Sequence, residues 1–134
     1  MAKLQTIKDN KQREAKGVWV DYEMGIQFKI AKMGNPKFQA KVRELSAPHI
    51  KQIRNDGLPQ DKMEAIQLEA VSETILVGWK NIEGDDGKAM RYSAKRAKEI
   101  LGDAELLSIY EFVLTEATKQ ANYTVEVAED SIKN

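Results

Sequence analysis

Apolar and polar residues alternate in the segment between Gly17 and Lys32. Side chains two positions apart share one face of a strand, so this alternation predicts two half-buried strands. The buried faces would carry Val18, Val20 and Tyr22 in the first strand and Ile26, Phe28 and Ile30 in the second. The three residues between them end in Gly25, which suits a tight hairpin connection. The sequence therefore predicts a β-hairpin over residues 17–32.

Helical spacing replaces the alternation after Asn35, a good N-cap residue that Pro36 follows at the first helical position. Apolar residues then recur every three or four positions in segments covering residues 36–45, 48–54, 60–78, 93–101 and 104–121. The core-facing residues are predicted to be Phe38, Val42, Leu45, Ile50, Ile53, Met63, Ile66, Ala70, Val71, Ile75, Ala97, Ile100, Leu101, Leu106, Leu107, Tyr110, Val113, Leu114 and Ala117. Residues 75–79 are compatible with a strand as well, but we expect the helix to end near Gly78.

These patterns predict an α+β fold, mainly α, in which the N-terminal hairpin packs on a bundle of about five helices within residues 36–121. A two-stranded hairpin is marginal in water, so its apolar face needs such a cover. With 134 residues the chain is long enough for one domain with one core. We expect this domain to span residues 17–121. Both ends contain few apolar residues, so we expect a flexible basic arm at 1–16 and a frayed acidic tail at 122–134.

The connection between two of the helical segments has the most specific pattern in the chain. It begins with Gly78, Trp79 and Ile82, continues through Asp86 and Gly87, and ends with Tyr92 and Ser93. Asp and Gly favour turns, and Ser is a good helix N-cap. The three large residues of this set are predicted to pack into the core and to fix one corner of the fold.

The formal net charge is zero, but the two halves of the chain differ in charge. Residues 1–54 contain 12 Lys and Arg against 5 Asp and Glu, and residues 55–134 contain 9 against 16. Solvated helix faces and a basic arm account for this asymmetry. The alternative is attraction between opposite halves of neighbouring copies, which would weaken as the salt concentration rises.

No residue pattern predicts catalysis, so we expect that the protein is not an enzyme. His49 is the single histidine and the chain has no cysteine, so neither a zinc site nor a nucleophile with an adjacent imidazole base is indicated. Asp85 and Asp86 lack the other ligands of a calcium loop. No glycine-rich phosphate-binding signature occurs. We therefore expect no cofactor and no metal.

Basic residues gather near Trp19 and Phe28, a combination that can bind single-stranded nucleic acid. They are Lys29, Lys32, Lys37, Lys41 and Arg43. The acidic second half would repel phosphate, so we expect no nucleic-acid partner. No segment approaches the roughly 20 apolar residues of a membrane span, and the N-terminus lacks the apolar stretch of a signal peptide. We therefore expect no membrane association and a cytoplasmic location.

Two parts of the chain resemble tail assembly chaperones of long-tailed bacteriophages, the siphophages. The first runs from Gly17-Val18-Trp19-Val20 through Phe28-Lys29-Ile30-Ala31 to Gly34-Asn35-Pro36-Lys37-Phe38, and the second from Gly78-Trp79 to Tyr92-Ser93. The two parts occur in the order expected for that family, and the resemblance covers about residues 17–121. Both are packing and turn motifs, so the resemblance assigns no catalytic residue.

The resemblance implies a chaperone that binds and solubilises the very long, helical tape-measure protein and helps recruit the major tail protein during tail-tube assembly. The major tail protein would be bound mainly by a longer form made by ribosomal frameshifting, and this chain would be the shorter product. Such a protein acts in the host cell cytoplasm and is absent from the mature virion. The alternative is a structural tail or head–tail joining protein that is retained in the virion.

A chaperone for a long client needs many weak, repeated contacts, so we expect a homo-oligomer. Flexible methionines and exposed aromatic rings suit varied client surfaces. The candidate partner-binding residues are therefore Trp19 and Met24 at the hairpin, Met33 at its exit and Met90 beside the acidic turn.

Overall fold

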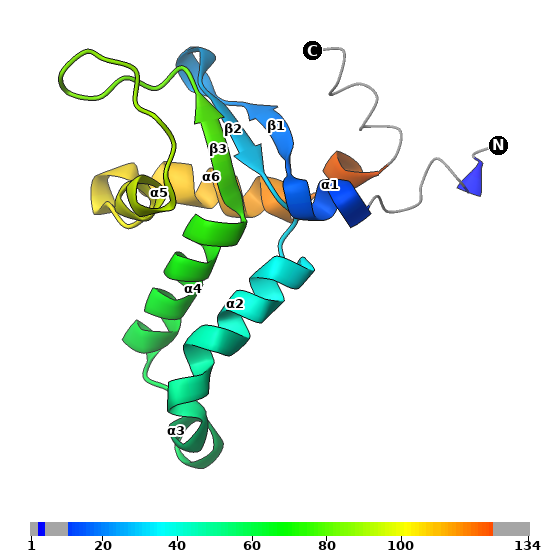
Figure 1. Cartoon of the computed structure of the whole chain (residues 1–134), viewed down its shortest axis with the longest axis vertical. Coiled ribbons are helices and arrows are strands. Elements are labelled where there is room, and N and C mark those ends of the chain that lie inside the picture. The colour runs from blue at the N-terminus through cyan, green and yellow to red at the C-terminus, as the bar shows by residue number, and fades with distance from the viewer. Residues whose placement is uncertain (1–2, 5–10, 125–134) are drawn as a thin grey trace.

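The computed structural model describes residues 3–4 and 11–124, and confirms the predicted α+β, mainly α fold (Figure 1). The elements of these residues, in chain order, are α1 (Lys11–Lys16), β1 (Val18–Asp21), β2 (Gln27–Ile30), α2 (Pro36–Ser46), α3 (Ile50–Asn55), α4 (Gln60–Thr74), β3 (Leu76–Lys80), α5 (Ala94–Leu101) and α6 (Leu107–Ala117). Short 3-10 turns precede α3 and α6 and follow α6.

The predicted hairpin is present as the antiparallel pair β1 and β2. Val18 lies opposite Ile30 and Val20 opposite Phe28, so the apolar residues share one face as the alternation predicted. The connection is a 3-10 turn at Glu23–Gly25, in which Met24 has a φ of 58°. This left-handed conformation is uncommon for a residue with a side chain, and it turns the chain within three residues.

Residues 76–80 form a third strand, β3, where we expected the last turns of a helix. Helix α4 ends at Thr74, and β3 pairs antiparallel with β2, Trp79 lying opposite Phe28. The local sequence was compatible with both structures. Pairing with the exposed edge of β2 decided between them. In the strand conformation the backbone groups of residues 76–80 find hydrogen-bond partners on β2, which the end of a helix would not find there.

The core lies between the inner face of the sheet and the helices α4, α5 and α6. Its fully buried members include Phe28, Ile30, Val71, Ile75, Leu76, Ala97, Val113 and Ala117. The ring of Tyr22 lies 5.5 Å from that of Phe28 and 4.7 Å from that of Phe112, in tilted geometries that favour aromatic contact. The sheet is thereby fastened to α6.

The connection from β3 to α5 forms the predicted corner. The rings of Trp79 and Tyr92 meet edge to face at 5.0 Å, and the Trp79 Nε1 donates a hydrogen bond to the Met90 carbonyl at 2.8 Å. Ile82 packs against the core. The turn is closed by Asp86, whose carboxylate accepts from the Lys88 amide, and by Gly87 at a φ of 74°. Ser93 caps α5 as expected, because its hydroxyl accepts from the Arg96 amide.

Residues 11–16 differ from the flexible arm that we expected, because they form α1 and pack on the body. The Glu14 side chain is buried, and its carboxylate lies 3.1 Å from the Lys32 ammonium. The Lys32 amide also donates to the Glu14 carbonyl at 2.8 Å. An ion pair and backbone bonding thus hold a segment that has few apolar residues. The rest of the predicted arm, apart from residues 3–4, lies outside the described residues.

Residues 118–124, which follow α6, also pack on the body. Tyr123 is fully buried, and its hydroxyl donates to the Ile30 carbonyl at 3.1 Å. Glu116 is buried, and its side chain contacts Lys119 and Asn122. Residues 125–134 of the predicted acidic tail lie outside the described residues.

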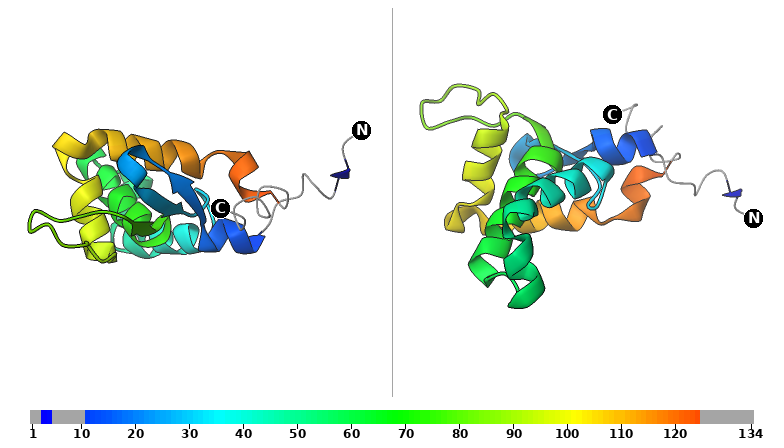
Figure 2. Two further views of the ribbon diagram at one scale, coloured as in Figure 1. Left: turned by 90° about the horizontal axis from the view of Figure 1, so that it is seen from above. Right: turned by 60° about the horizontal axis from the view of Figure 1, so that its bottom comes forward.

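Helices α2 and α3 and the first two-thirds of α4 project away from the sheet, and we call residues 36–69 the helical arm (Figures 1 and 2). Neither α2 nor α3 has a buried residue, and burial in α4 starts at Ala70. Three residues that we expected in the core are exposed here: Ile50 by 45%, Ile53 by 40% and Met63 by 53%. The prediction was wrong for these residues because no other element of the described chain packs across this face. Leu107 of α6, at 56% exposed, was also wrongly placed in the core.

Candidate partner-binding cleft

The helical arm contains an apolar cleft with a volume of about 510 Å³. It is formed by α2, α3, the α3–α4 connection and the first half of α4. The lining residues are Phe38, Val42, Ser46, Ile53, Gly57, Leu58, Met63, Ile66 and Gln67. No lining residue has an ionisable side chain. The cleft is therefore built for apolar contact.

Helical spacing brings one side of the cleft together. Phe38, Val42 and Ser46 follow one another at intervals of four residues, so they lie on one face of α2. The start of this helix is fixed by Asn35, whose side-chain oxygen accepts from the amides of Lys37 at 2.9 Å and Phe38 at 3.1 Å. Asn35 also donates to the Lys32 carbonyl, so the cap anchors the arm to the end of the hairpin.

The far end of the cleft is formed where α3 turns back into α4. Gly57 has a φ of 76°, which a residue without a side chain adopts at low cost. Leu58 follows it and lines the cleft between α3 and α4. On α4, Met63, Ile66 and Gln67 stand at helical spacing and form the opposite wall.

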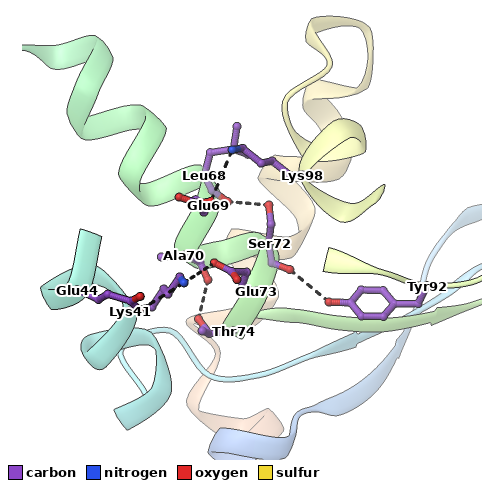
Figure 3. A network of polar contacts seen from close by, with 10 residues as sticks. All are labelled: Lys41, Glu44, Leu68, Glu69, Ala70, Ser72, Glu73, Thr74, Tyr92 and Lys98. Carbon is purple, nitrogen blue, oxygen red and sulfur yellow. Dashed lines mark hydrogen bonds and ion pairs between the residues drawn. The ribbon is translucent and has the colours of Figure 1, made fainter. Parts of the chain in front are cut away.

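An ion-pair network holds the two long helices of the arm together (Figure 3). The Lys41 ammonium lies 3.0 Å from Glu73 on α4 and 3.4 Å from Glu44 on its own helix. The contact with Glu73 raises the pKa of Lys41. On the other side of α4, Glu69 lies 3.8 Å from Lys98 of α5. The arm is thereby joined to the body through charged side chains as well as through the buried end of α4.

The buried end of α4 carries two hydroxyls that are satisfied within the helix. Ser72 donates to the Leu68 carbonyl and Thr74 to the Ala70 carbonyl, each at 2.7 Å. The Tyr92 hydroxyl donates to the Leu76 carbonyl at 2.7 Å. It also lies 3.2 Å from the Ser72 carbonyl (Figure 3). Burial raises the pKa of Tyr92. These contacts hold the junction between α4 and β3 together.

The four partner-binding candidates from the sequence lie outside the cleft. Met24 is 90% exposed at the tip of the hairpin, as a contact residue should be. Met33 and Met90 are partly buried against the core. Trp19 lies on the outer face of the sheet, where the Lys80 ammonium stands 4.1 Å from its ring centroid and Gly78 leaves room beneath the ring. Binding by these four residues stays a prediction.

Sequence reasoning missed the cleft because five of its lining residues, Phe38, Val42, Ile53, Met63 and Ile66, were assigned to the core. Ile53 and Met63 have the spacing of core positions in amphipathic helices, and nothing in that spacing shows whether a partner element belongs to the same chain.

The turn around Asp86 and Gly87 is present as the sequence predicted. A second, polar hollow of about 320 Å³ lies there beside Met90, and Asp85, Asp86, Lys88 and Arg96 contribute to its lining.

Within residues 3–4 and 11–124, no three His, Cys, Asp or Glu side chains are grouped as metal ligands would be. Over the same residues, no helix combines the length and the apolar character that crossing a membrane requires. His49 belongs to the 3-10 turn before α3.

Comparison with known families finds one match that covers most of the chain. A family model described as YdaY prophage protein matches residues 33–134, a range that contains the whole helical arm and the corner between β3 and α5. No curated protein and no solved structure matches the chain.

Proposed function

The chain belongs to the YdaY prophage protein family and is thus a phage protein, and from this premise we propose that it acts as a tail assembly chaperone. In this role it binds and solubilises the tape-measure protein while the tail tube is built. It helps recruit the major tail protein, mainly through a longer frameshifted form. It works in the host cell cytoplasm and is left out of the mature virion.

The apolar cleft of the helical arm is the observation that carries this proposal. A groove between helices, lined by branched, aromatic and methionine side chains, suits the apolar face of an amphipathic helix. The lining residues Met63 and Ile53 are 53% and 40% exposed, so they are accessible to such a partner. Met63 also has a flexible side chain that adapts to differing client sequences.

The size of the cleft supports a weak, repeated mode of binding. A volume of about 510 Å³ accommodates a few side chains rather than a folded partner. A long client presents many groups of apolar side chains, so many copies of the chaperone can bind along it, each with modest affinity. Copies that are joined to one another bind more tightly overall, because each bound copy raises the effective concentration of its neighbours at the client. The resemblance of residues 17–38 and 78–93 to tail chaperones adds to this support.

Co-expression with a candidate tape-measure protein from the same phage genome tests the proposal. The wild-type chain is expected to move that protein from the insoluble to the soluble fraction and to co-purify with it. Ile53→Glu combined with Met63→Glu should abolish the rescue, because a carboxylate placed in an apolar contact loses its hydration without gaining a partner.

Leu107→Glu is the matched control, because Leu107 is 56% exposed but lies on α6, outside the cleft. This variant is expected to rescue the client as well as the wild type does. If the wild-type chain is folded and in excess and the client stays insoluble, the chaperone role is wrong. If purified virions contain many copies of the chain, the alternative role as a retained structural protein is correct instead.

A further inference from the structure

No element within residues 3–4 and 11–124 covers the apolar face of the helical arm. None of the side chains of α2 and α3 is buried, yet the arm carries Ile50, Ile53 and Met63 at exposures of 40% or more. Helices this short gain most of their stability from packing of an apolar face. An arm of this kind therefore needs a surface to pack on.

We propose that, in the absence of a client, a second copy of the same arm covers this face, so that the cleft is the interface of a two-fold symmetric dimer. The pairing itself does not depend on the proposed chaperone function. Displacement of the second copy by a client does rest on it.

The charges of the arm favour a second copy. Helices α2 and α3 carry Lys37, Lys41, Arg43, Lys51 and Arg54 against Glu44. The part of α4 in the arm carries Asp61, Glu64 and Glu69 against Lys62, and Glu73 follows at the base of the arm. One side of the arm is thus basic and the other acidic. Within one copy the two sides already attract each other, as the 3.0 Å contact between Lys41 and Glu73 shows. The exposed charges near the tip, such as Arg54 and Asp61, are available for the same attraction between copies.

These charges also select one orientation of the pair. A two-fold axis parallel to the helices places the basic side of each arm over the acidic side of the other, whereas an axis across the helices places like charges together. The first arrangement also sets α2 antiparallel to the partner's α4, because α2 and α4 run in opposite directions in the arm (Figure 1). The resulting assembly is a bundle of four long helices, in which apolar stripes face inward.

The size of the face fits a reversible dimer. The 11 residues of α2 rise about 16 Å, and two packed helices are about 20 Å wide, so the face with α3 added measures roughly 400 Å² in projection. Side chains make the accessible surface of each face larger than its projected area. A pair of such faces therefore buries about 1,000–1,200 Å² of accessible surface, the lower limit of specific interfaces. A dimer of this kind protects the apolar cleft and still yields to a client helix that buries the same residues.

Sedimentation of the purified chain without any client tests the pairing. The wild type is expected to shift from monomer to dimer as its concentration rises through the micromolar range. Met63→Glu should raise the dissociation constant at least tenfold, because two carboxylates would lie at the centre of the interface. Leu107→Glu on α6 should leave the constant unchanged. Circular dichroism checks that both variants fold.

Charge reversal tests the orientation. Lys51→Glu with Arg54→Glu makes both sides of the arm acidic at its tip, and Asp61→Lys with Glu64→Lys makes both sides basic there. Each double variant alone should form a weaker homodimer than the wild type, and an equal mixture of the two should restore pairing as a heterodimer. Both effects follow from complementary charges across the two-fold axis.

Several results would overturn the inference. The wild type could stay monomeric at all concentrations, or the dimer could persist in Met63→Glu. The mixture of the two charge-reversal variants could also pair no better than either variant alone. A dimer with the expected behaviour but no effect on client solubility would instead contradict the proposed function and leave the pairing established.

Discussion

Tyr123 is fully buried although it lies in a part of the chain with few large apolar residues. Burial, together with the nearby Glu116, raises the pKa of its hydroxyl well above the usual value of 10.0. Its neighbours are polar in the sequence, so the periodicity gave no sign of this role. The residue that faces it, Ile30, is 93 positions away. Only the folded chain brings the two together.

Tyr123→Phe is expected to destabilise the protein by about 1–2 kcal/mol at neutral pH, because a buried hydrogen bond to the Ile30 carbonyl is lost. The wild type should also lose stability as the pH rises above about 10. There the unfolded tyrosine releases its proton while the folded one keeps it, so the folded state binds more protons. Urea unfolding at pH 7 and pH 11 measures both effects.

The variant should show a smaller loss of stability between those two pH values than the wild type does. Tyr110→Phe is a suitable comparison, because burial raises the pKa of Tyr110 as well but less strongly. An identical pH dependence for Tyr123→Phe and the wild type would contradict the burial of this hydroxyl.

At the level of elements, the hairpin and most helices could be predicted from periodicity and capping residues. Val18, Val20 and Phe28 lie where alternation places them, and Asn35 and Ser93 cap their helices. The strand β3 could not be predicted with certainty. Its residues fit two conformations, and pairing with β2, about 50 positions earlier in the chain, decided the outcome.

Asn35→Ala tests how much the cap of α2 contributes. The side chain accepts two amide hydrogen bonds and donates one, so its loss should cost about 1–2 kcal/mol in thermal or urea unfolding. Hydrogen exchange should accelerate most in the first turn of α2. Asn55→Ala, at the exposed end of α3, should change stability by less than about 0.5 kcal/mol. Equal effects of the two variants would argue against the cap.

At the scale of the whole molecule, charge and apolar surface are divided between two parts. The body has a core under the sheet, and the helical arm displays its apolar residues in the open cleft. The charge asymmetry between residues 1–54 and 55–134 recurs in the arm, because α2 and α3 come from the basic half and α4 from the acidic half. The sequence showed the asymmetry, but only the fold shows that the two halves lie side by side.

Raising the ionic strength is therefore expected to weaken self-association. The screening length falls from about 10 Å at 0.1 M salt to about 3 Å at 1 M, so attraction between the charged sides of two arms decreases. The apolar contacts persist, so the dissociation constant should rise without pairing being abolished. Sedimentation equilibrium in increasing sodium chloride measures this change. A dissociation constant that does not change with salt concentration would contradict an electrostatic contribution to self-association.

By itself the sequence determined the class of the fold, the hairpin, the helix caps and the corner around Trp79 and Tyr92. These features depend on contacts within a few residues or on patterns that repeat along one element. The tertiary structure alone decided that residues 76–80 are a strand, that Tyr123 is buried, and that Ile53 and Met63 line a cleft. An apolar stripe specifies that a surface will be covered, and only the arrangement of all the elements determines whether the same chain provides the cover.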